Sequence, residues 1–171
     1  MIELPDDSEV NITHIIVKPL YFGMVCNVII PLAALFGIYF YNNKYGGTNH
    51  VGNSEPFIFY LLIGVTIIET LGVVWWRDRL FKTPMIKRAE TFEADFGAEY
   101  LKRCRPIFLV IASLSLYGVV FYFLTGQFER SVIFVIISYV VFQIVRPRHG
   151  LVSKLLAHQR ELVKKGEFLR S

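Results

Sequence analysis

One uninterrupted apolar stretch, Pro56 to Trp76, constrains the fold of this chain more than any other feature of its sequence. A helix of about 20 residues, rising about 1.5 Å per residue, crosses the roughly 30 Å hydrocarbon core of a bilayer. The stretch has that length, and Glu69 is its only acidic or basic side chain. It therefore predicts a membrane-spanning helix.

The composition predicts that most of the chain is of the same kind. Hydrophobic residues make up 54% of the 171 and charged residues only 19%, whereas a soluble domain usually carries about 25% charged residues. Three further apolar runs cover residues 20–41, 106–125 and 128–145. Together with 56–76 they predict an all-α, polytopic integral membrane protein whose four-helix bundle occupies residues 20–145.

Two segments outside the spans have the periodicity of amphipathic helices. In the first, Thr83 and Pro84 resemble an N-cap followed by proline at the first helical position, which predicts a helix over 84–104. The second is the basic tail, residues 146–171. Each apolar face needs a lipid surface or a protein surface to cover it. The basic tail suits an anionic leaflet, and for 84–104 we expect docking on the tail or on a partner subunit.

Lysine and arginine predict the orientation, since cytoplasmic loops of membrane proteins are enriched in them. Of the 18 in the chain, eight lie in 77–105 and seven in 146–170, whereas the other two connectors hold only Lys44 and Arg130. We therefore expect a protein of the cytoplasmic (inner) membrane. Its central segment, its N-terminal residues 1–19 and its tail would all face the cytoplasm.

Given that orientation, one polar side chain in each span lies seven residues from the expected cytoplasmic end. These side chains are Glu69, Asn27, Ser113 and Ser138. Polar groups in a bilayer turn toward other helices, so we expect an intramembrane polar layer in which Asn27 pairs with Glu69. Glu69 would either donate a hydrogen bond that locks helix packing or act in cation or proton transfer. We favour the structural interpretation, because a relay needs more titratable groups than these apolar runs contain.

Basic residues flank the cytoplasmic ends of the spans and are candidates for contact with anionic lipid headgroups or with a partner: Arg77, Arg79, Arg146, Arg148, Lys154, Lys164 and Lys165. The sequence Arg77-Asp78-Arg79 could clasp a lipid phosphate or simply anchor the end of a span, and the second interpretation is the more common one.

No pattern of catalytic residues is recognisable, and all four histidines lie outside the apolar runs. We therefore expect no catalytic site, metal, cofactor or nucleic-acid partner. The sequence favours a non-catalytic membrane subunit that scaffolds a larger complex or a homo-oligomer. A small ion or proton channel using Glu69 is the alternative, and a membrane-embedded lipid-modifying enzyme is a third.

Overall fold

The protein is described from a computed structural model that covers residues 11–169. Within that range every regular element is helical, and four helical stretches are long and apolar enough to cross a membrane. These stretches are Ile12–Tyr45, Gly52–Phe81, Ala89–Thr125 and Phe128–Val145. The prediction of an all-helical chain with four candidate spans is confirmed.

The first stretch is a helix with one irregular turn. It consists of α1 (Ile12–Met24), the π-helical turn η1 (Val25–Ile29) and α2 (Ile30–Tyr45). Pro31 has no N–H and its ring crowds the carbonyl group of Asn27, four residues earlier, so a regular α-helical turn cannot form there. The Ile30 N–H instead reaches back five residues to the Val25 carbonyl oxygen.

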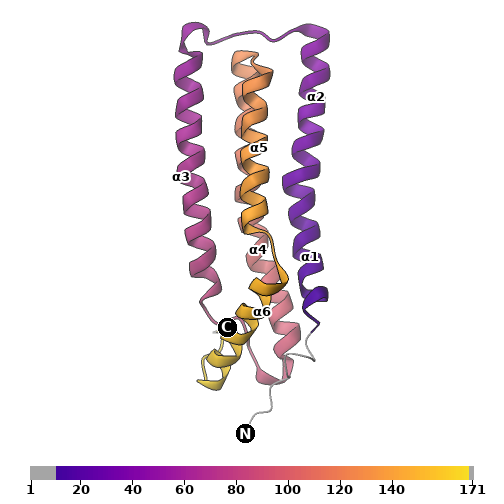
Figure 1. The fold of residues 1–171 in the computed structure, drawn as a ribbon, viewed down its shortest axis with the longest axis vertical. Coiled ribbons are helices and arrows are strands. Elements are labelled where there is room, and N and C mark those ends of the chain that lie inside the picture. Colours follow the sequence, from indigo (N-terminus) through magenta and orange to yellow (C-terminus); the bar gives the residue numbers. More distant parts are fainter. Residues whose placement is uncertain (1–10, 170–171) are drawn as a thin grey trace.

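The second stretch, α3 (Glu55–Phe81), is preceded by the short 3-10 turn η2 (Gly52–Ser54). The loop between α2 and α3 crosses one end of the molecule (Figure 1). It touches the turn at Gly126, where a Cβ on Gly47 would lie 2.3 Å from the Gly126 carbonyl oxygen. Only glycine permits that approach. The His50 N–H also donates to the Leu124 carbonyl oxygen at 3.0 Å.

The third stretch differs from the sequence prediction. The short turn η3 (Ala89–Thr91) leads into α4 (Phe92–Thr125), one helix that contains both the third span and most of the segment expected as a separate helix over 84–104. The prediction that a helix starts at Pro84 is therefore wrong. The Thr83 hydroxyl donates to the Leu80 carbonyl oxygen at 2.8 Å instead of capping a new helix.

Side chains from distant elements hold residues 82–88 in their non-helical path. The Arg103 guanidinium donates to the carbonyl oxygens of Leu80 at 2.6 Å and Pro84 at 2.7 Å, and to the Thr83 hydroxyl at 2.7 Å. The Asp95 carboxylate accepts the two backbone N–H groups of residues 87 and 88. These partners satisfy backbone groups that a helix would otherwise pair, which explains why local sequence alone misplaced the helix start.

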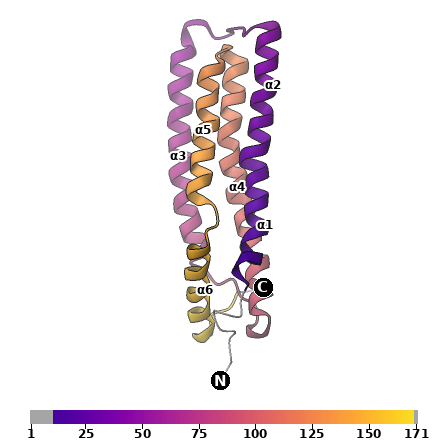
Figure 2. The same cartoon turned by 45° about the vertical axis from the view of Figure 1, so that its right-hand side comes forward.

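The fourth stretch is α5 (Phe128–Val145), which matches the expected span 128–145, and a short link joins it to α6 (His149–Lys164) in the basic tail. Figures 1 and 2 show α4 and α5 side by side at the centre, with α3 on one flank and α1–α2 on the other. Gly118 allows α4 and α5 to come close, because a Cβ there would lie 2.5 Å from the Ser131 carbonyl oxygen.

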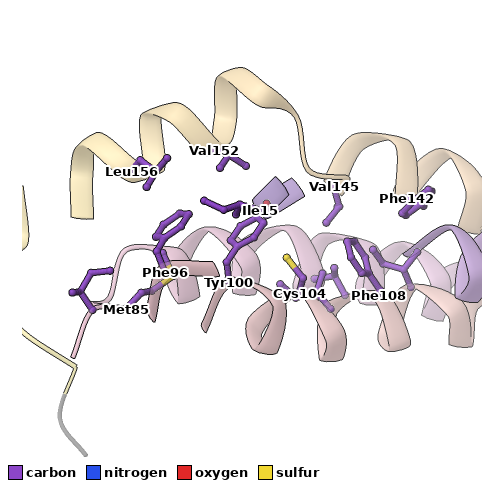
Figure 3. Packing of buried hydrophobic residues seen from close by; sticks show 14 of the residues in the cluster. Ile15, Met85, Phe96, Tyr100, Cys104, Phe108, Phe142, Val145, Val152 and Leu156 are labelled. Carbon is purple, nitrogen blue, oxygen red and sulfur yellow. The ribbon is translucent and has the colours of Figure 1, made fainter. Parts of the chain in front are cut away.

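The hydrophobic core continues beyond the spans into the end of the molecule that holds α6 (Figure 3). In that region Val152 and Leu156 of α6 point toward Phe96 and Tyr100 of α4 (Figure 3), and all four side chains are at most 5% exposed. The apolar faces of the tail helix and of the first turns of α4 thus cover each other.

The four long stretches are buried to very different degrees. In its most apolar part the stretch that contains α4 is 44% buried, whereas the one that contains α3 is only 11% buried. Large apolar side chains project from α3 over most of its length, among them Phe57, Tyr60, Ile68 and Trp75, each more than 60% exposed. The outer face of α3 is therefore left for lipid or for another protein to cover.

Candidate functional site

Glu69 of α3 contacts α4 through both of its carboxyl oxygens. Its Oε1 lies 2.8 Å from the Ser113 Oγ, and its Oε2 accepts a hydrogen bond from the Tyr117 hydroxyl at 2.8 Å. Ser113 and Tyr117 are four residues apart and so lie on the same face of α4. We call these three side chains the carboxyl cluster.

The number of hydrogens in the carboxyl cluster indicates how it is bonded. The Ser113 hydroxyl also lies 2.5 Å from the Val110 carbonyl oxygen, so three short contacts compete for the hydrogens. An ionised Glu69 leaves only the two hydroxyl hydrogens for three contacts. A protonated Glu69 supplies the third: its O–H donates to Ser113, Ser113 donates to Val110, and Tyr117 donates to the other carboxyl oxygen. The geometry therefore fits a neutral carboxylic acid.

The expected pairing of Asn27 with Glu69 is wrong. Asn27 is 1% exposed and donates from Nδ2 to the Gly23 carbonyl oxygen at 3.0 Å, within its own helical stretch. Its Oδ1 has no hydrogen-bond partner. The π-helical turn around Asn27, which Pro31 imposes, could not be read from depth in the span alone.

The other two members of the expected polar layer are placed as follows. Ser113 joins Glu69, whereas the Ser138 hydroxyl of α5 donates to the Ile111 carbonyl oxygen of α4 at 2.9 Å. Tyr117 was missed by the sequence prediction, although its position four residues after Ser113 in a span was the signal that could have found it. The hydrogen bonds thus form three separate sites instead of one network.

The carboxyl cluster lies near the outside of the α3–α4 seam. Glu69, Ser113 and Tyr117 are all half-buried, and Ile68, the neighbour of Glu69, is 72% exposed. Thr70, which follows Glu69, has a buried hydroxyl without a hydrogen-bond partner. Polar groups therefore reach the most exposed helix of the protein at the middle of its apolar stretch.

A second candidate site is a cavity of about 310 Å³ where α3, α4 and the α5–α6 link meet. We call it the basic cavity. Its polar lining residues come from both sides of the link: Arg77, Asp78, Lys82, Arg146, Lys154 and His158. The remaining wall is apolar and is built from Phe81, Tyr100, Val145, Pro147, Leu151 and Leu155.

Three of the basic residues singled out from the sequence line the basic cavity: Arg77, Arg146 and Lys154. The other four lie elsewhere. Arg79 lies over the Trp75 ring, with its guanidinium carbon 5.2 Å from the ring centroid, and Arg148 donates to the Gln143 carbonyl oxygen at 2.9 Å. Lys164 and Lys165 are exposed at the end of α6. Lys82 and His158 were not predicted, because only the docking of α6 brings them to the cavity.

Two contacts fix polar groups at the edge of the basic cavity. Arg77 forms an ion pair with Asp78, with 2.7 Å between Nη2 and Oδ1. The His158 Nε2–H donates to the Lys82 carbonyl oxygen at 3.4 Å. The first contact leaves Lys82, Arg146 and Lys154 as the cations of the cavity that Asp78 does not neutralise.

Across residues 11–169, no three His, Cys, Asp or Glu side chains come together as metal ligands would. No protein-family model, curated protein or solved structure matches this chain. The functional proposals below therefore rest on the chain's own residues and geometry.

Proposed function

We propose that this chain is a non-catalytic subunit of the cytoplasmic (inner) membrane, which assembles with other chains or with copies of itself through the outer face of α3. The four apolar helical stretches would cross the bilayer as a bundle. The α6 end of the molecule would face the cytoplasm.

The orientation rests on where the basic residues lie. The segments 77–105 and 146–169 carry most of the lysines and arginines of the chain, and α6 packs beside the first turns of α4 at one end of the molecule (Figure 1). The opposite end holds the loop before α3. This asymmetry is what the positive-inside rule requires of a protein with both termini in the cytoplasm.

We further propose that the first turns of α4 and the whole of α6 act as the two cytoplasmic amphipathic helices. Their apolar faces cover each other, which leaves their charged faces in water. The Asn11 N–H donates to a Glu93 carboxyl oxygen at 3.2 Å, so the start of α1 is tied to the same layer.

The observation that carries the assembly proposal is the half-buried carboxyl cluster on α3, the helix whose apolar part is only 11% buried. Lipid covers exposed apolar side chains without cost, but it offers no partner to a carboxyl group or a hydroxyl at that depth. A neighbouring protein helix would cover these groups and provide hydrogen-bonding partners. Assembly is therefore favoured over a lone monomer in lipid.

The same cluster argues against proton or ion transfer by Glu69. Hydrogen bonds to Ser113 and Tyr117 engage both carboxyl oxygens. Asn27, the partner that the channel alternative required, bonds to its own helical stretch instead. The structural role accounts for the contacts that Glu69 makes.

Photocrosslinking in native membranes tests the assembly proposal. A benzophenone maleimide is attached at Ile68→Cys, on the exposed face of α3, in a background carrying Cys26→Ala and Cys104→Ala. The matched control is Ile136→Cys on α5, since Ile136 is also exposed, at 55%. We expect one discrete protein adduct from position 68 whose mass identifies a second copy or another subunit. Equal adducts from both positions, or lipid adducts alone, would overturn the proposal.

A further inference from the structure

The basic cavity combines cations with an apolar wall at the level where two spans end. Arg77 follows Trp76 directly in α3, and Arg146 follows Val145, the last residue of α5. Under the proposed topology, both helices reach the cytoplasmic surface of the bilayer at these positions. The cavity therefore lies where lipid headgroups meet acyl chains.

The charges of the cavity are unbalanced. Four permanent cations and His158 line it, with Asp78 as the single carboxylate. Asp78 is already engaged by Arg77. Cations gathered in this way repel one another, so an anion placed among them gains from each of them.

The opposite wall of the cavity excludes a small hydrophilic ion as the best fit. Phe81, Tyr100, Leu151 and Leu155 line it, and they offer a chain of methylene groups a surface away from water. About 310 Å³ lies within the usual size range of small-molecule sites, about 300–1,000 Å³. The lining thus matches a ligand with one anionic end and one apolar end.

The cations come from two parts of the chain that only the docking of α6 brings together. Arg77 and Lys82 belong to the α3 end, whereas Arg146 and Lys154 belong to the α5–α6 link and to α6. The link is short and contains Pro147, and the Arg146 N–H donates to the Phe142 carbonyl oxygen at 2.8 Å. An anion held between the two pairs would connect α6 to α3.

We propose that the basic cavity binds the anionic headgroup of a membrane amphiphile, a phosphate monoester or diester with an acyl chain, and that the apolar wall takes the first part of that chain. The proposal shares the membrane orientation given above but not the assembly through α3. A single chain in detergent contains the whole site.

Binding of a short-chain phosphatidic acid to the full-length protein in neutral detergent, followed by native mass spectrometry, tests this proposal. The cavity variant is Arg146→Gln with Lys154→Gln. The matched control is Arg148→Gln with Lys164→Gln, which removes the same charge outside the cavity. We expect the cavity variant to weaken binding at least tenfold, the control to bind as the unaltered protein does, and phosphatidylcholine of the same chain length to bind at least tenfold more weakly.

Two additional arms keep the result unambiguous. Lys82→Gln, which changes an exposed side chain on the α3 side, is expected to weaken binding as well, so a fault confined to α6 would not mimic the effect. Inorganic phosphate at the same concentration is expected not to compete. Equal losses in the cavity and control variants, equal binding of phosphatidylcholine, or full competition by inorganic phosphate would each overturn the proposal.

Discussion

The carboxyl group of Glu69 has few ways to satisfy itself, because only Ser113 and Tyr117 donate or accept within reach. Ser113 in turn contacts the Val110 carbonyl oxygen. The three contacts are all satisfied when Glu69 carries a proton. At this scale the chemistry is decided by counting hydrogens on named atoms.

We expect Glu69→Gln to leave the thermal unfolding midpoint in detergent unchanged, because an amide donates and accepts as a neutral acid does. Glu69→Ala leaves the Tyr117 hydroxyl without its partner and should cost about 0.5–2 kcal/mol. Infrared spectroscopy should also show the carbonyl stretch of a protonated carboxyl at neutral pH, which Glu69→Gln abolishes. A carboxylate band in its place would contradict the assignment.

Arg103 is the other residue on which local structure depends, since its guanidinium is 7% exposed and bonds to three backbone carbonyl oxygens between residues 80 and 84. Lysine keeps the charge but lacks the planar set of five donors. We expect Arg103→Lys to destabilise the protein by about 2–4 kcal/mol.

The measurement is the change in the free energy of unfolding, followed by tryptophan fluorescence. Lys102→Met is the control, because the Lys102 side chain is 79% exposed and should change stability by less than about 0.5 kcal/mol. If the two variants behave alike, the Arg103 contacts do not hold the connector.

Residue pairings across helices were the hardest feature to predict from sequence. Depth in the bilayer placed Ser113 near Glu69 correctly, but depth says nothing about rotation around the helix axis. Asn27 shows the consequence: Pro31 forces a π-helical turn around it, and its side chain bonds to the Gly23 carbonyl oxygen.

Among the elements, spans were predictable and the connector was not. The fourth span was predicted over 128–145 and α5 covers Phe128–Val145, because length and apolarity alone define such a helix. The helix expected from Pro84 begins at Phe92 instead. Its start depends on Arg103, Asp95 and Gln159, all more than six residues away in sequence, which a local capping pattern does not register.

The docking of α6 depends on one fully buried side chain. Gln159 is 0% exposed; its Oε1 accepts from the Met85 N–H at 2.8 Å, and its Nε2 donates to the Thr83 carbonyl oxygen at 3.1 Å. We expect Gln159→Leu to speed hydrogen exchange at the Met85 amide at least tenfold, which corresponds to about 1.4 kcal/mol of local stability. Ala157→Leu, on the exposed face of α6, should leave the rate unchanged. Unaltered exchange in Gln159→Leu would show that α6 docks without this contact.

At the scale of the whole molecule, the composition and the four apolar runs were enough to predict a membrane protein with four spans. The relative burial of the helices was not predictable, because all four runs are similarly apolar. Only the packed structure shows that α4 and α5 form the centre while α3 stays largely exposed (Figure 2).

The orientation can be tested with a membrane-impermeant maleimide in a background carrying Cys26→Ala and Cys104→Ala. We expect Asn49→Cys, in the loop before α3, to be labelled from outside the cell. Lys154→Cys, on α6, should be labelled only after the membrane is permeabilised, because basic segments stay in the cytoplasm. The reverse pattern would show that the orientation is inverted and that the basic cavity faces outward.

Native mass spectrometry of the unaltered protein, extracted with its surrounding lipids in nanodiscs, tests the proposed assembly most directly. The chain itself accounts for 19.7 kDa. We predict a larger species containing at least one additional protein chain, reduced in abundance when Ile68 on the exposed face of α3 is replaced by tryptophan. A species containing one copy of this chain and lipid alone would contradict the proposal that α3 is a site of assembly.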